Sequence, residues 1–260
     1  MKEFTQKKIA LVNDVTGFGR CSVAVALPII SALKVQCCFL PTAILSNHTG
    51  FDTFFFDDYT SKMRQYINSW KEINLKFDGI CTGFLGSEEQ IDIVIEFLET
   101  FKTENNIVII DPVMGDYGKI YPTYTDAMCE KMQHLIKYAD CITPNLTELC
   151  RLLNIPYPEE TPSPEELNNL CEEISKEGPS KIVITGLKRD GDIENFIFEK
   201  GKEFKTIRVK KIGEDRSGTG DVFTSIVSAS LVNGEDFAHC VNKAVNFISK
   251  ALKFTTDLKL

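Results

Sequence analysis

A glycine-rich turn followed by a carboxylate stands near the end of the sequence, at Gly218-Thr219-Gly220-Asp221. Because glycine lacks a Cβ, the backbone N–H groups of such a turn can approach an anion closely. The apolar run that follows predicts a helix, whose N-terminal N–H groups and positive dipole end favour negative charge. Asp221 would then lie beside a bound phosphate, where it could accept a proton from an attacking hydroxyl. The alternative is an ordinary capped surface helix, since Thr, Gly and Asp are common at helix starts.

Two other segments place carboxylates directly after apolar runs typical of strands. Asp111 follows the run 107–110, and Asp116 lies five residues further on. Carboxylates at a strand end could hold Mg²⁺ against phosphate oxygens, directly or through water, although an Asp-Pro turn with a solvated second Asp would look the same. Asn145 and Glu148 open a later helix. Glu148 therefore either contacts a Mg²⁺-bound water or completes a capping box with Asn145.

A polar loop at Ser46-Asn47-His48-Thr49-Gly50 follows an apolar segment. His48 could hydrogen-bond a substrate hydroxyl or ring oxygen, but a lone loop histidine is also commonly structural. With three histidines and no GxSxG sequence, a Ser/His/Asp hydrolase is disfavoured. The pair Gly17 and Gly19 gives only a weak dinucleotide-binding pattern, because Ser22 replaces the third glycine and no acid follows at the required spacing.

The composition excludes several classes of partner. The chain has 260 residues, 43% of them apolar and 25% charged, with a net charge of −8. That charge argues against nucleic acid and anionic membranes as partners. Nine scattered cysteines without metal-site spacing are typical of reduced thiols, and we expect a cytoplasmic protein. Apolar runs stay shorter than the roughly 18 to 20 residues of a membrane span, so no membrane association is expected.

Strand and helix patterns alternate along the chain, which predicts one α/β domain over residues 1–260 with a mostly parallel central sheet, helices on both faces and an antiparallel edge hairpin. We predict strands at 9–12, 35–40, 77–82, 107–110, 141–142 and 181–185, and helices at 22–33, from Ser87, at 127–138, from Ser163, and two at the end, split near Gly234. Ser87 and Gln90 fit a capping box. The hairpin spans 190–201; as an alternative it could fold over a nucleotide. Ligands of such sheets bind beyond the carboxyl ends of the strands, where the polar segments above lie.

Five motifs in this order resemble the pyridoxal kinase branch of the ribokinase-like superfamily over nearly the whole chain. They are Ser46-Asn47-His48-Thr49, Gly83-Phe84-Leu85-Gly86-Ser87, Asp111-Pro112-Val113-Met114-Gly115-Asp116, Pro144-Asn145-Leu146-Thr147-Glu148 and Gly218-Thr219-Gly220-Asp221. The resemblance implies a ribokinase-like fold and an ATP-dependent kinase that phosphorylates the 5′-hydroxymethyl group of vitamin B6 vitamers (pyridoxal, pyridoxine and pyridoxamine). It also implies Mg²⁺, a homodimer and possible activation by a monovalent cation.

The resemblance also assigns roles by position. Asp221 would be the base, and the backbone N–H groups of Gly218, Thr219 and Gly220 would stabilise the transferring phosphoryl group. The nucleotide and its metal would be organised by a set of polar residues: Asp111, Asp116, Thr143, Asn145 and Glu148. Those approaching the pyridine ring would be Asn47, His48, Thr49 and Phe84, the last standing where the family usually has tyrosine.

One position departs from the family. Pyridoxal kinases commonly carry a ring-contacting serine after the first strand, and here Asn13 or Asp14 takes that place. An acid there would favour a cationic group such as the aminomethyl of pyridoxamine.

Three other functions remain as alternatives. Hydroxymethylpyrimidine kinase of thiamin synthesis shares the fold and the reaction, but often has cysteine where this chain has Asp221. A non-catalytic vitamer-binding protein on the same fold is disfavoured by the intact motifs. A nicotinamide oxidoreductase would rest on the weak glycine pattern alone.

Overall fold

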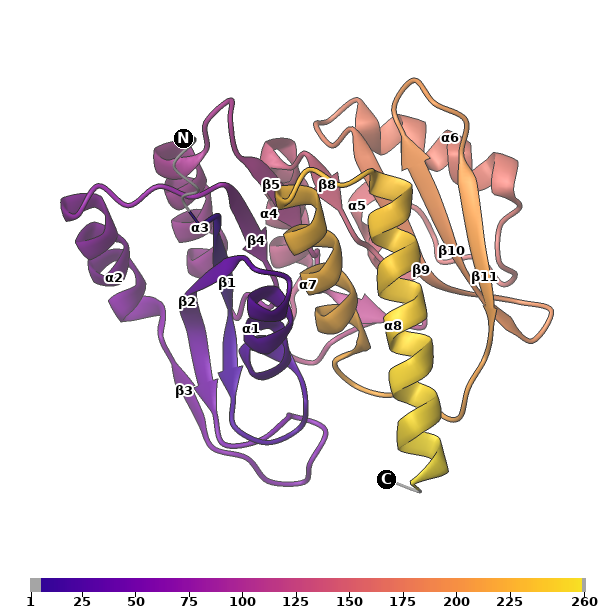
Figure 1. Ribbon diagram of the computed structural model, residues 1–260, viewed down its shortest axis with the longest axis horizontal. Helices are drawn as coiled ribbons and strands as arrows, with labels where there is room; N and C mark the ends of the chain where they lie inside the picture. Colours follow the sequence, from indigo (N-terminus) through magenta and orange to yellow (C-terminus); the bar gives the residue numbers. More distant parts are fainter. Residues whose placement is uncertain (1–5, 259–260) are drawn as a thin grey trace.

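A nine-stranded sheet runs through the centre of the computed structural model, which describes residues 6–258 (Figure 1). The strand order is β11-β10-β9-β8-β5-β4-β1-β2-β3, and the six strands from β9 to β2 are parallel. The remaining strands, β3 at one edge and β10 and β11 at the other, are antiparallel to their neighbours. The strands span β1 Lys8–Thr16, β2 Gln36–Leu45, β3 Phe56–Asp58, β4 Gly79–Thr82, β5 Ile107–Ile110, β8 Cys141–Ile142, β9 Lys181–Arg189, β10 Asp192–Glu199 and β11 Lys205–Lys210. A separate short hairpin pairs β6 (Gly115–Asp116) with β7 (Lys119–Ile120).

Helices cover both faces of this sheet. One face carries α1 (Ser22–Ala32), α7 (Thr219–Val232) and α8 (Phe237–Asp257), with Val227 and Val241 among the buried side chains between layers. The other face carries α2 (Thr60–Glu72), α3 (Glu88–Phe101), α4 (Asp126–Leu135), α5 (Leu146–Leu153) and α6 (Pro164–Ser175), around a core that includes Phe97 and Phe196. The predicted fold, a mostly parallel sheet between helices with an antiparallel edge hairpin, is confirmed.

The first predicted strand is longer than expected. Pairing with β2 continues to Thr16 opposite Leu45, so Asn13 and Asp14 lie inside β1 and not beyond its end. The register of β1 against β2 shifts between Asn13 and Val15, which marks a β-bulge at this point of the pairing. The expected strand 35–40 likewise extends to Leu45, because β1 and β3 both pair with its second half.

Other boundaries also differ from the prediction. The helix expected at 127–138 ends at Leu135 and continues as a 3-10 turn, Ile136–Tyr138. Ser87 caps α3 as predicted, but the side chain of Gln90 does not complete the box. Its amide instead donates to the Thr42 carbonyl and the Thr60 hydroxyl, each at 2.8 Å, because Gln90 is fully buried against β2 and α2.

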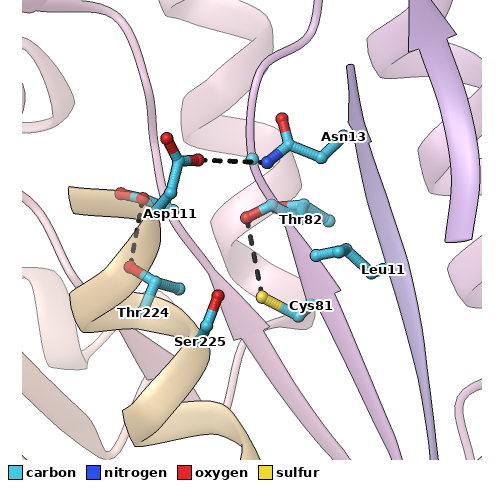
Figure 2. Close-up of a pocket in the computed structure, with 9 residues that line it drawn as sticks. Leu11, Asn13, Cys81, Thr82, Asp111, Thr224 and Ser225 are labelled. Carbon is cyan, nitrogen blue, oxygen red and sulfur yellow. Dashed lines mark hydrogen bonds between the residues drawn. The ribbon is translucent and has the colours of Figure 1, made fainter. Parts of the chain in front are cut away.

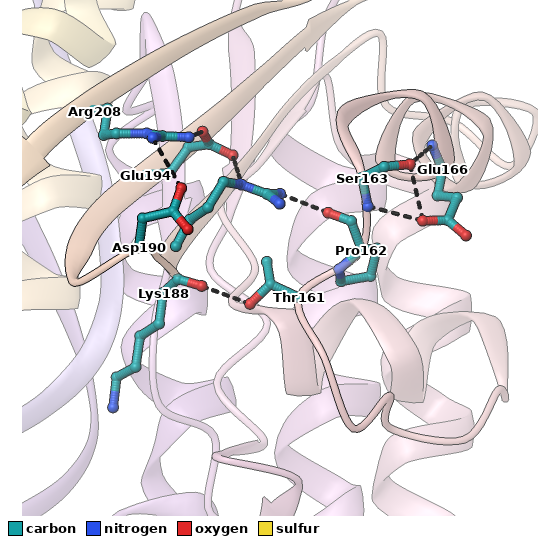
Figure 3. A network of polar contacts seen from close by, with 9 residues as sticks. Thr161, Pro162, Ser163, Glu166, Lys188, Asp190, Glu194 and Arg208 are labelled. Atoms are coloured by element: carbon teal, nitrogen blue, oxygen red, sulfur yellow. Dashed lines mark hydrogen bonds and ion pairs between the residues drawn. The ribbon is translucent and has the colours of Figure 1, made fainter.

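The antiparallel edge is fixed by a buried carboxylate (Figure 3). Glu194 on β10 is nearly fully buried and pairs with Arg189 on β9 and Arg208 on β11, each at 3.1 Å. Arg189 also donates to the carbonyl of Pro162, and Thr161 donates to that of Lys188. A buried carboxylate needs such partners, since an unpaired one costs several kcal/mol. The network therefore ties the segment before α6 to β9, whose Thr185 bridges to Asn145 at the start of α5.

Candidate active site

The carboxylate of Asp221 lies at the carboxyl edge of the sheet, in the first turn of α7. Its Oδ1 accepts a hydrogen bond from Nδ2 of Asn13 at 3.2 Å, and its Oδ2 accepts one from the backbone N–H of Ser22 at 2.9 Å. Burial raises the pKa of Asp221, and these two hydrogen bonds partly offset that rise. A carboxylate with a raised pKa is a stronger base, and here β1 and α1 fix its orientation.

The turn before Asp221 needs glycine at its first position. Gly218 has φ +82°, and a Cβ on it would lie 2.1 Å from the carbonyl oxygen of Arg20. A Cβ on Gly220, by contrast, would meet no atom within 4 Å. The first N–H groups of an α-helix have no partner within the helix, so the start of α7 at Thr219 supplies unsatisfied donors. N–H groups at a helix N-terminus are donors that anions commonly use, so this turn is a candidate anion site.

Asp111 follows β5 and lines a small cavity that Asp221 also lines (Figure 2). Thr224 lies one turn after Asp221 on α7, and its hydroxyl donates a hydrogen bond to Oδ2 of Asp111 at 3.1 Å. The Thr224 and Thr143 hydroxyls are 3.0 Å apart. Burial and then the charge of Asp221 raise the pKa of Asp111. A bound cation would relieve both effects, so this carboxylate fits a metal ligand. Thr224 is a site residue that the sequence analysis missed, although its spacing from Asp221 places both on one helix face.

Glu148 is buried and completes the capping box of α5. Its Oε2 accepts from the N–H of Asn145 at 2.8 Å, and its Oε1 accepts from that of Met114 at 3.2 Å. The structural alternative weighed above is thus present in the structure. Burial, and then the charge of Asp111, raises the pKa of Glu148. Each oxygen retains acceptor capacity, so a capping role and a contact with a metal-bound water are compatible.

The hairpin after Asp111 carries two further residues of interest. Asp116 is exposed and accepts a hydrogen bond from the N–H of Tyr117, while Nδ2 of Asn145 donates to the Gly115 carbonyl at 2.7 Å. Burial raises the pKa of the Tyr121 phenol, and so do the charges of Glu148, Asp116, Asp111 and Asp221, in that order. Tyr121 therefore lies within electrostatic range of these four carboxylates, and no sequence pattern had marked it.

Asp111, Asp116 and Glu148 do not form a ready-made metal cage. Within residues 6–258, no group of three or more His, Cys, Asp or Glu side chains is arranged to hold a metal ion. Mg²⁺ usually takes one or two protein carboxylates and completes its shell with water and substrate phosphates. The donor set fits that pattern.

The remaining predicted residues lie in two loops and in the second half of β1. Asp14 is buried and accepts a 2.6 Å hydrogen bond from Thr16, while Oδ1 of Asn13 accepts from the backbone N–H of Phe84 at 2.9 Å. The charge of His48 lowers the pKa of Asp221, so the imidazole lies within electrostatic range of it. The polar atoms of Asn47 bond within their own loop, to Ser46 and Thr53, and Thr49 is exposed.

Within residues 6–258, no helix has an apolar stretch of the length that a membrane crossing requires.

Comparison with known proteins identifies the family. The model of the phosphomethylpyrimidine kinase family matches residues 27–260. A pyridoxal kinase of Arabidopsis thaliana is 30% identical over 228 residues, which cover 82% of this chain and 70% of that protein. The chloroplastic thiamine biosynthetic bifunctional enzyme of rice is 25% identical over 92% of this chain, but the chain spans only 43% of that enzyme's length.

Solved structures give the same result. A Bacteroides thetaiotaomicron protein assigned provisionally as a phosphomethylpyrimidine kinase superposes with a TM-score of 0.95 at 38% identity, covering 99% of this chain and 89% of that one. A second crystal form of it contains pyridoxal and superposes with a TM-score of 0.91, covering 95% and 87%. The chain therefore belongs to the phosphomethylpyrimidine kinase family of the ribokinase-like superfamily, together with the pyridoxal kinases.

Proposed function

We propose that this protein is an ATP-dependent kinase that phosphorylates the 5′-hydroxymethyl group of a vitamin B6 vitamer. The observation that carries the proposal is the placement of Asp221: an oriented carboxylate that follows the glycine turn and lines one cavity with a second carboxylate, Asp111. The relative that was crystallised with pyridoxal supports a pyridine alcohol as the acceptor.

In this mechanism the substrate hydroxyl lies between Asp221 and the γ-phosphate of ATP. Asp221 takes the hydroxyl proton as the oxygen attacks phosphorus, and the β–γ bridging oxygen leaves with ADP. The N–H groups of Gly218, Thr219 and Gly220 stabilise charge on the transferring group. Asn13 and Ser22 hold the base in place, and His48 and Phe84 border the acceptor.

Asp111 and Glu148 are the residues that we propose to hold Mg²⁺, with Asp116 at the edge of the same site. The ion supplies positive charge against the phosphate oxygens. Thr143 and Asn145 then orient the nucleotide side of the site, because Thr143 contacts Thr224 and Asn145 fixes Gly115.

The second candidate is phosphorylation of hydroxymethylpyrimidine, which the matched family and the thiamine biosynthetic relatives favour. Both acceptors are heteroaromatic primary alcohols, so the same base and anion site would serve either. Asp221 at the base position, where pyrimidine kinases often carry cysteine, is the reason for preferring the B6 acceptor.

A competition assay separates these candidates. The protein is given ATP, Mg²⁺ and equal amounts of pyridoxal, pyridoxine, pyridoxamine and hydroxymethylpyrimidine, and each phosphorylated product is quantified. We expect a B6 phosphate to dominate. If only hydroxymethylpyrimidine were phosphorylated, the second candidate function would be the correct one. If no alcohol were phosphorylated, kinase activity would be refuted and a vitamer-binding protein would be favoured. Homodimer formation and monovalent-cation activation remain expectations from the family.

A further inference from the structure

A buried hydroxyl beside Asp111 and Asp221 has no hydrogen-bond partner. Within the described part of the chain, three buried side-chain polar atoms lack one: Oγ1 of Thr82, the hydroxyl of Tyr124 and Oγ of Ser175. Thr82 is the last residue of β4 and only 1% exposed. Burying a hydroxyl without a partner costs free energy, so each such group in a folded protein calls for an explanation.

Thr82 lines the same small cavity as Asp111 (Figure 2), and Asp221 lines it as well. The cavity has a volume of about 10 Å³, which is close to the minimum that holds one water molecule. Its lining combines the apolar Leu11 and Cys81 with polar groups from Asn13, Asp111, Asp221, Thr224 and Ser225. A buried water is stable only where two to four polar groups surround it, and this cavity supplies them.

The two carboxylates have acceptor capacity left. Asp111 accepts a hydrogen bond from Thr224, with the Thr143 hydroxyl as a further donor, and Asp221 accepts one from Asn13 and one from Ser22. An ionised carboxylate has about four lone-pair sites, so each can accept another hydrogen bond. The Thr82 hydroxyl, in contrast, needs an acceptor for its proton. A water molecule has two hydrogens to donate and lone pairs to accept with, which matches this set.

We propose that the cavity is a binding site for one ordered water, which donates hydrogen bonds to Asp111 and Asp221 and accepts one from Thr82. The water bridges two like charges that otherwise repel each other, and it adds a third contact that orients Asp221. Thr82 is then a positioning residue that acts on Asp221 through the water. The kinetic part of this inference rests on the proposed role of Asp221, whereas occupancy of the site does not.

The occupancy is tested by crystal structures of the whole protein at a resolution that resolves single waters. In the wild type we expect a peak at about 2.7–3.2 Å from the Thr82 hydroxyl and from both carboxylates. Thr82→Val keeps the branched shape without the hydroxyl and should lose the peak, while Thr82→Ser should retain it. An empty wild-type cavity would overturn the proposal. A peak whose height rises with the potassium concentration would overturn it too, because the occupant would then be a monovalent cation and not a water.

The positioning role is tested by kinetics on the same variants. Thr82→Val should lower kcat about fivefold, as expected for loss of one hydrogen bond, with the KM values for ATP and alcohol unchanged and with Thr82→Ser restoring kcat. Ser175→Ala on α6 removes a comparable unpartnered hydroxyl far from the site and should leave kcat as it is. A Thr82→Val enzyme with wild-type kcat would overturn the positioning role. Failure of the wild type to phosphorylate any alcohol would instead refute the proposed function, because the crystallographic result does not depend on turnover.

Discussion

The phenol of Tyr117 donates a 2.5 Å hydrogen bond to Oδ2 of Asp215, which joins two segments that lie 98 residues apart. Tyr117 belongs to the hairpin that follows Asp111, and Asp215 precedes the glycine turn at Gly218. Nζ of Lys188 lies 4.1 Å above the Tyr117 ring and 3.7 Å from Asp215. Tyr117 adopts φ +50°, a conformation that is unfavourable for an aromatic residue and is held here by these contacts. The contact thus connects the acidic loop to the anion turn.

Removing the Tyr117 hydroxyl should weaken nucleotide binding. Tyr117→Phe keeps the ring against Lys188 but loses the hydrogen bond that sets the spacing of the two segments. We expect KM for ATP to rise about fivefold with kcat little changed, as for loss of one hydrogen bond to a charged group. Tyr138→Phe is the matched control, because the Tyr138 phenol contacts Glu99 at 3.0 Å between α3 and the end of α4. Equal KM values for the two variants would rule out this role of Tyr117.

Substitutions at the two glycines of the anion turn should differ in kind. Gly218→Ala places a Cβ 2.1 Å from the carbonyl oxygen of Arg20 and holds an alanine backbone in the left-handed conformation. We therefore expect the free energy of unfolding to fall by about 2 kcal/mol or more. Gly220→Ala meets no atom and should leave stability nearly unchanged. Its methyl group nevertheless enters the space assigned to the phosphate, so kcat/KM for ATP should fall about tenfold or more. Denaturant unfolding and steady-state kinetics on both variants measure this contrast. Full activity in Gly220→Ala would show that the phosphate does not bind at this turn.

The stability of the metal-free protein should fall as the pH rises. Burial, and then the charge of Asp221, raises the pKa of Asp111 from 3.8 to about 7, so between those values the folded state binds more protons than the unfolded state. The free energy of unfolding therefore decreases with pH across that range, and this contribution is fully present only below the lower value. Asp111→Asn should flatten the slope, whereas Asp257→Asn at the exposed end of α8 should not. An unchanged slope in Asp111→Asn would mean that Asp111 does not titrate in this range.

The choice among vitamers should depend on Asp14. This carboxylate is buried and accepts a hydrogen bond from Thr16, and it lies close enough to Asp221 for its charge to raise the pKa of Asp221. Asp14→Asn removes the charge but keeps an oxygen acceptor for Thr16. We expect the ratio of kcat/KM for pyridoxamine over pyridoxal to fall about tenfold, the size of a charge-assisted hydrogen bond to the aminomethyl group. A ratio equal to that of the wild type would remove Asp14 from vitamer selection.

The sequence predicted the parallel core well, because buried strands such as Ile107–Ile110 are continuous apolar runs between helices. It did not predict α2, whose N-cap residue Tyr59 makes no capping hydrogen bond and whose buried face presents chiefly Met63 and Ile67. The three-residue strand β3 was also missed, since its side chains are exposed and carry no alternation.

The site was predictable where motifs fall at strand ends and helix starts, as for Asp111 and Asp221. Contacts that depend on packing between distant segments carried no signal in the sequence. The hydrogen bond from Asn13 to Asp221 and the pairing of Tyr117 with Asp215 are of this kind. The register of Asn13 and Asp14 in particular was set by a bulge that no residue pattern marks.

In the proposed reaction, Asp221 takes the proton of the alcohol during phosphoryl transfer. The most direct test is the single-turnover rate of transfer from ATP to the preferred alcohol, compared between the wild type and Asp221→Ala with folding checked by circular dichroism. We expect a rate at least about 100-fold lower in the variant, as for loss of a positioned base. A folded variant that retains more than about a tenth of the wild-type rate would contradict it.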